Sequence, residues 1–139
     1  MSKYLNTTLI FIGVWIVSSL LNGIFSGVSI LIFEGNAFNA SAGTVLLACI
    51  FSFACSIPMV ALVWLVTVIA IACGKYGHDL FQIILTAALF CALIGAIFFL
   101  LTFGKEFNAA KYWIALSINI TAISGILAFR HKLKLINHA

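Results

Sequence analysis

The stretch 43–73, GTVLLACIFSFACSIPMVALVWLVTVIAIAC, contains no Asp, Glu, Lys, Arg or His. A helix needs about 20 consecutive apolar residues to cross the hydrocarbon core of a bilayer. This stretch is longer than that, and it carries no charge that would have to be buried in lipid. We therefore expect it to form one membrane-spanning helix, and this expectation decides the fold class of the chain.

Three more stretches of the same kind accompany it. Together the four stretches predict spans at 7–33, 43–73, 80–103 and 112–130. The connector 74–79 is short, and short connectors make consecutive helices lie antiparallel. The sequence therefore predicts an all-α integral membrane protein: a single domain covering 1–139, with four transmembrane helices in an antiparallel bundle.

The composition fits such a protein. Of the 139 residues, 65% are hydrophobic and 7% are charged. Soluble domains usually have about 25% charged residues. The longest expected connector covers only 34–42, so we expect no soluble enzyme or binding domain beside the spans. The first apolar stretch is longer than the apolar region of a signal peptide, about 7–15 residues, so we expect it to be retained.

The charged residues flank the spans and predict the orientation of the chain. Lys and Arg accumulate on the cytoplasmic side of short membrane loops. One side of a four-span arrangement would hold Lys3, Lys75, Arg130, Lys132 and Lys134, and the other would hold Lys105, Lys111, Glu34 and Glu106. We therefore expect both termini in the cytoplasm. The net charge of +4 then needs no nucleic acid partner. The short chain, with almost nothing outside the spans, favours a bacterial inner membrane, with a membrane of a eukaryotic organelle as the alternative.

The second predicted span contains a proline and a tryptophan that bear on packing. Pro58 lacks the N–H that would bond the Ala54 carbonyl, so we expect a bend there, with Ser52 or Ser56 supplying a donor. Trp64 lies at the same depth as a tryptophan of the first span, Trp15. The two indoles either pair the first two helices or face the lipid headgroups.

Small residues recur every four positions on three of the predicted helices. This spacing places them on one helix face and lets two backbones approach closely. The predicted helix-contact residues are Ser19, Gly23 and Gly27 in the first span, Ala87, Cys91 and Gly95 in the third, and Ser117, Thr121 and Gly125 in the fourth. They serve either packing within the bundle or contact with a second membrane protein or a second copy.

Two amides lie deep in the spans, where an unpaired amide is costly. Asn22 is near the middle of the first span, and Asn119 is inside the fourth. A direct or water-mediated contact between them would join the two helices. The alternative is a polar lining for a neutral or anionic solute, assisted by the hydroxyls of Ser18, Ser26, Thr121 and Ser124.

The spans lack the groups that most membrane chemistry requires. Proton-coupled and cation-coupled transporters place ionisable residues in the membrane, and haem-binding bundles use axial ligands such as histidine. Neither kind of group lies between the flanking charges of any span. The four cysteines form no close pair, so we interpret them as small packing residues rather than a disulfide or metal framework.

The connectors offer little chemistry either. His78, Asp79, His131 and His138 would share one face of the membrane, but their spacing matches no metal site. Asp79 is better interpreted as the N-cap of the third helix. No nucleophile–base pair or paired carboxylates can be assembled on one side of the bilayer. We therefore expect no catalytic residues, no metal and no cofactor.

What remains is a non-catalytic membrane protein that acts through helix–helix contacts with another membrane component. It would be an accessory subunit of a membrane complex, or a protective protein in toxin immunity, phage exclusion or phage defence. The alternative is a small oligomeric channel or uniporter lined by Asn22 and Asn119.

Overall fold

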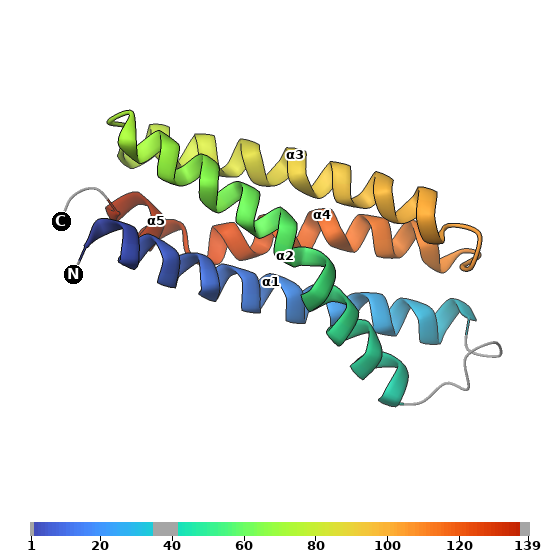
Figure 1. Cartoon of the computed structure of the whole chain (residues 1–139). Coiled ribbons are helices and arrows are strands. Elements are labelled where there is room, and N and C mark those ends of the chain that lie inside the picture. Colours follow the sequence, from blue (N-terminus) through green and yellow to red (C-terminus); the bar gives the residue numbers. More distant parts are fainter. Residues whose placement is uncertain (1, 35–41, 137–139) are drawn as a thin grey trace.

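The computed structural model describes residues 2–34 and 42–136, and these residues form a bundle of long helices (Figure 1). The helices are α1 (Lys3–Glu34), α2 (Ala42–Ala72), α3 (Gly77–Phe103), α4 (Ala110–Ala128) and the short α5 (Arg130–Leu135). The described ranges contain no strand. The helices α1 to α4 are long and apolar enough to cross a membrane. The predicted fold class, an integral membrane bundle of four antiparallel helices, is confirmed.

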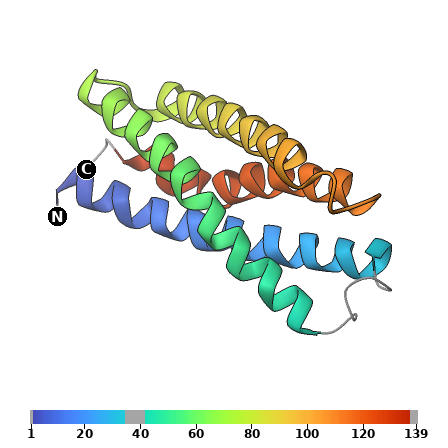
Figure 2. The same cartoon turned by 45° about the vertical axis from the view of Figure 1, so that its right-hand side comes forward.

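The bundle has two ends, which we name by what they carry. The terminal end holds the start of α1, the connection from α2 to α3, and α5. The loop end holds Glu34 and the connection from α3 to α4. Helix α2 crosses α1 obliquely, so that it lies beside α3 at the terminal end and diverges from it towards the loop end (Figures 1 and 2). The ring of Phe51 on α2 still reaches that of Phe103 on α3, with centroids 5.7 Å apart.

The tightest core lies at the terminal end. Its largest fully buried side chains are Ile71, Leu80, Ile84, Leu133 and Ile136. Two of these, Leu133 and Ile136, come from α5 and the residue after it, so the short helix closes the end of the bundle. The outer surface is apolar, with large hydrophobic side chains exposed along every spanning helix. Such a surface is costly in water and favourable in lipid.

The end of the fourth helix differs from the prediction. We expected one span at 112–130, but α4 ends at Ala128, and Phe129 adopts φ −101° and ψ 9°. Helix α5 then begins at Arg130, and its Leu133 is fully buried. The chain breaks here because redirecting α5 against α3 buries these apolar side chains in the terminal core.

The predicted N-cap of the third helix is wrong. Helix α3 begins at Gly77, with Tyr76 as its N-cap, and Asp79 lies within the first turn. Gly74 and Gly77 have φ of 77° and 58°, which glycine adopts without a steric penalty, and they turn the chain early enough for the helix to start before Asp79. The Asp79 carboxylate still lies near the positive end of the helix dipole.

Pro58 lies inside α2, as the sequence requires. The expected partner of the freed Ala54 carbonyl is not Ser56, because the Ser56 hydroxyl donates to the Phe53 carbonyl at 3.1 Å. The bend expected at Pro58 stays a prediction.

Candidate helix-contact and polar sites

The small-residue stripe of α1 is packed against α2. A Cβ on Gly23 would lie 2.5 Å from the Cys49 Cα, and one on Gly27 would lie 2.8 Å from the Val45 Cα. No real side chain fits at such distances, so the two backbones touch. The predicted helix-contact face is therefore present, and it is used within the chain.

A hydrogen-bonded group continues this contact along α1 and α2. The Trp15 indole N–H donates to Ser56 Oγ at 2.8 Å, and Ser19 Oγ lies 2.8 Å from the same oxygen. Nearer the terminal end, the Trp64 indole N–H donates to Thr8 Oγ1 at 3.2 Å. Both tryptophans therefore bridge α1 and α2, which is the pairing that one of the two interpretations of the sequence predicted.

A second polar group, which we call the Asn22 cluster, joins α1, α2 and α4. It consists of Asn22, Ser26, Ser52 and Ser117. Asn22 Nδ2 donates to Ser52 Oγ at 2.9 Å, and Ser117 Oγ donates to Asn22 Oδ1 at 2.7 Å. Ser26 Oγ lies 3.2 Å from Ser117 Oγ. The cluster contains no ionisable group, so its chemistry is that of a hydrogen-bonded junction between three helices.

The second predicted amide does not join this cluster. Asn119 Nδ2 donates to the Ala115 carbonyl of its own helix at 3.0 Å. Its Oδ1 is buried and accepts no hydrogen bond. The expected direct contact between Asn22 and Asn119 is absent from the described side chains, because Ser52 and Ser117 occupy the Asn22 amide instead.

The stripe of α4 faces α1. Ser117 and Thr121 are buried, and Thr121 Oγ1 donates to the Ser117 carbonyl at 2.7 Å. Gly125 lies so close to Ser18 that an added Cβ would overlap Ser18 Oγ. Ser18 Oγ is itself buried without a hydrogen-bond partner. All three predicted residues of this stripe therefore serve internal packing.

The stripe of α3 makes looser contacts. Ala87 and Cys91 are half-buried against the terminal core. A Cβ on Gly95 would lie 3.4 Å from the Met59 Cε and 3.9 Å from the Ile118 Cγ2, which are ordinary van der Waals distances. This stripe does not bring two backbones together as Gly23 and Gly27 do.

A carboxylate at the loop end was not predicted as a functional group. Glu34 is only 7% exposed, and its Oε1 accepts the backbone N–H of Asn108 at 2.6 Å. Its Oε2 lies 3.5 Å from Asn108 Nδ2. This contact ties the end of α1 to the segment that leads into α4. The sequence signal was weak: an acidic residue ending one span, and an asparagine shortly before another.

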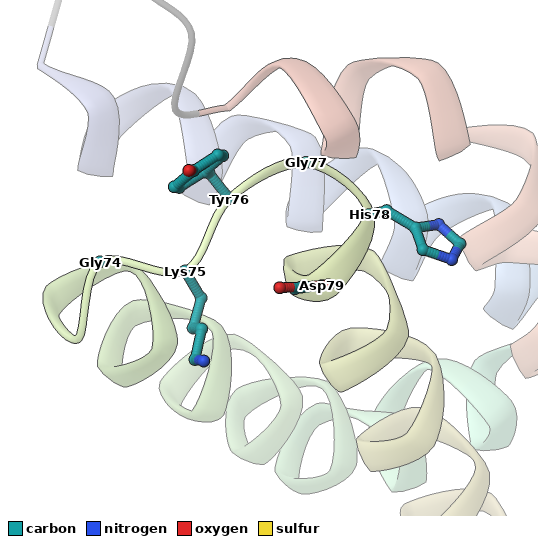
Figure 3. Close-up of a pocket in the computed structure, with 6 residues that line it drawn as sticks. All are labelled: Gly74, Lys75, Tyr76, Gly77, His78 and Asp79. Carbon is teal, nitrogen blue, oxygen red and sulfur yellow. The ribbon is translucent and has the colours of Figure 1, made fainter.

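The connection from α2 to α3 forms a shallow, open hollow lined by residues 74–79 (Figure 3). Its side chains spread apart: Lys75 and His78 point away from each other, while Asp79 points into the hollow. In the part of the chain that the structure describes, no group of three or more His, Cys, Asp or Glu residues is placed to hold a metal ion. His138 lies outside the described residues.

One outward-facing strip of small residues on α2 was not predicted from the sequence. Ala54, Pro58 and Ala61 are exposed on α2, at the four- and three-residue spacing that places them on one helix face. Cys55 is exposed beside them. We call these three residues the α2 strip. The sequence did not distinguish it because α2 is apolar on every side.

Comparisons with known proteins return no match to a family model, to a curated protein or to a solved structure.

Proposed function

We propose that this protein is a non-catalytic membrane subunit that binds another membrane protein through the outward face of α2. It would serve as an accessory subunit of a complex or as a protective protein, in toxin immunity, phage exclusion or phage defence. We propose a bacterial inner membrane, because so little of the chain lies outside the spans, and both termini in the cytoplasm, because of the distribution of Lys and Arg.

The observation that carries the proposal is the α2 strip. The stripes of α1 and α4 are already occupied within the chain. Ala54, Pro58 and Ala61 are small, lie on the outside, and would let a partner helix approach the α2 backbone closely. The apolar windows of α2 and α3 are each only 22% buried, against 39% for α4, so most of α2, like most of α3, is free to meet lipid or a partner.

The alternative, a small oligomeric channel or uniporter, is favoured by one feature. The buried Asn119 Oδ1 accepts no hydrogen bond within the bundle, and a buried polar atom of this kind is a natural place for water or a polar solute. Against this alternative, the Asn22 amide is occupied by hydroxyls from α2 and α4. A permeation path along Asn22 would have to break that junction.

The test uses photo-crosslinking residues placed at exposed positions of the full chain in its native membrane. Leu47 on α2 and Leu116 on α4 are both exposed, so neither site should disturb the core. We expect a crosslink to a second protein from position 47 and none from position 116. Crosslinks to a second copy alone, from either position, would favour the channel.

A matched pair of substitutions tests the α2 strip itself. Ala61→Leu enlarges an exposed residue of the strip, and Ala128→Leu makes the same change at an exposed residue of α4. We expect the first to abolish co-purification of the partner while abundance in the membrane stays unchanged. Equal co-purification from both variants would contradict the proposal.

A further inference from the structure

The charges of the described residues are divided unevenly between the two ends of the bundle. The terminal end holds five basic residues: Lys3, Lys75, Arg130, Lys132 and Lys134. Its one acidic side chain among the described residues is Asp79. At the loop end, Lys105 and Lys111 are balanced by Glu34 and Glu106. The terminal end is therefore the strongly cationic one.

Helix α5 carries most of this charge and is held firmly in place. Leu133 and Ile136 are 0% and 1% exposed and lie in the terminal core. Arg130 and Lys132 are exposed on the same short helix. The basic side chains thus project from an element anchored in the bundle, and not from a free tail.

Aromatic rings further fix where these cations lie. The Arg130 guanidinium is 5.8 Å and the Lys134 Nζ is 5.5 Å from the centroid of the Phe81 ring. The Lys132 Nζ is 5.9 Å from that of Phe129. A ring attracts one side of a cation and leaves its other N–H groups available to an acceptor. Arg130 and Lys134, four residues apart, therefore share one face of α5 and one ring, whereas Lys132 lies over a different ring. The pair on Phe81 lies at the point where the last membrane span ends.

We propose that α5 is a binding site for the phosphodiester headgroup of anionic phospholipids, with Arg130 and Lys134, the two cations that share the Phe81 ring, as its main donors. A phosphate oxygen accepts strongly from guanidinium and ammonium groups. Each basic residue near an anionic membrane surface favours binding roughly fivefold. Lipid is the favoured occupant because the cations lie at the end of four membrane-crossing helices, where headgroups are concentrated. This inference does not depend on the α2 contact proposed above.

The experiment compares two lipids on the full-length protein purified in detergent. Phosphatidylglycerol and phosphatidylcholine with identical acyl chains are added separately, and retained lipid is counted by native mass spectrometry. We expect the wild type to retain phosphatidylglycerol preferentially, and the preference to weaken as ionic strength rises. Equal retention of the two lipids would overturn the proposal.

Matched double variants separate a site from net charge. Arg130→Gln with Lys134→Gln removes from α5 the two charges that share the Phe81 ring, and Lys105→Gln with Lys111→Gln removes two from the loop end. We expect the first to lower phosphatidylglycerol retention roughly 25-fold, about fivefold for each charge removed, and the second to leave it unchanged. An equal loss in both variants would show an effect of net charge only and would overturn the site.

Two further measurements keep the result decisive. Helical content by circular dichroism checks that each variant folds, and the single variant Lys134→Gln replaces the α5 double variant if that one does not. If the protein bound an acidic peptide or single-stranded DNA but did not distinguish the two lipids, the cations would belong to a site for a macromolecular partner. That result would overturn the lipid site.

Discussion

Gly125 of α4 lies directly against Ser18 of α1, and a Cβ on residue 125 would overlap the Ser18 Oγ. The Ser18 hydroxyl is buried there without a hydrogen-bond partner. Glycine at position 125 thus sets the approach of α1 and α4, while the serine contributes bulk and no bond. The two residues should respond oppositely to substitution.

Gly125→Ala should destabilise the protein, by about 1–3 kcal/mol, because the added methyl group must displace α1. Ser18→Ala should be neutral or slightly stabilising, since it removes a buried hydroxyl that has no partner. The pair should also couple, so that Ser18→Ala recovers part of the loss in the double variant. Unfolding in mixed micelles by SDS titration measures all three. Additive effects would contradict the contact.

Glycines of the predicted stripes should not be equally sensitive. At Gly23 an added Cβ would meet backbone, 2.5 Å from the Cys49 Cα, and backbone cannot yield locally. At Gly95 it would meet the flexible end of Met59 at 3.4 Å. Gly23→Ala should therefore cost about 1–3 kcal/mol, while Gly95→Ala should be tolerated. The same SDS titration measures both losses. Similar losses of stability for the two variants would contradict a closer backbone contact between α1 and α2 at Gly23.

This difference shows how far the sequence could lead. The spacing of Ser19, Gly23 and Gly27 was sufficient to predict a helix-contact face, because small residues four apart share a face in any helix. The spacing could not identify the helix that packs on that face, since a helix of the same chain and a helix of another protein both require small residues there. Only the three-dimensional arrangement shows that α2 occupies it.

The four spans follow from hydrophobicity alone, which is the strongest signal in a membrane protein. Two other features could not be predicted from the sequence. Helix α5 has only six residues, too few for a periodic pattern to be recognised. The α2 strip is apolar within an apolar helix, and its exposure depends on the angle at which α2 crosses α1.

The two deep asparagines should differ in their contribution to stability. Asn22 bonds across helices to Ser52 and Ser117, and interhelical hydrogen bonds in membranes contribute about 0.6 kcal/mol each. Asn22→Ala should therefore lower the free energy of unfolding by about 1 kcal/mol. Asn119→Ala should cost less, because that amide bonds only its own helix and leaves its Oδ1 unpaired.

The control for this comparison is a solute flux assay in proteoliposomes, run on both asparagine variants. If a channel were lined by these amides, Asn119→Ala would change flux while stability stayed near that of the wild type. The packing interpretation of Asn22 instead requires that Asn22→Ala lower stability more than Asn119→Ala does.

The Glu34–Asn108 contact should hold the loop end together. Glu34 Oε1 accepts the Asn108 N–H at 2.6 Å, and the carboxylate lies close to the start of α4, where the helix dipole favours negative charge. Glu34→Ala leaves that N–H without its acceptor, which should cost about 1–3 kcal/mol. In Glu34→Gln the amide oxygen can still accept, so only the charge-dependent part, about 0.3–1 kcal/mol, should be lost.

Hydrogen exchange at Asn108 and SDS titration measure the two effects. Glu106→Gln, at an exposed position of the same connection, is the matched control and should change neither. Equal losses in Glu34→Gln and Glu34→Ala would mean that charge, and not the hydrogen bond, secures α1 to the start of α4.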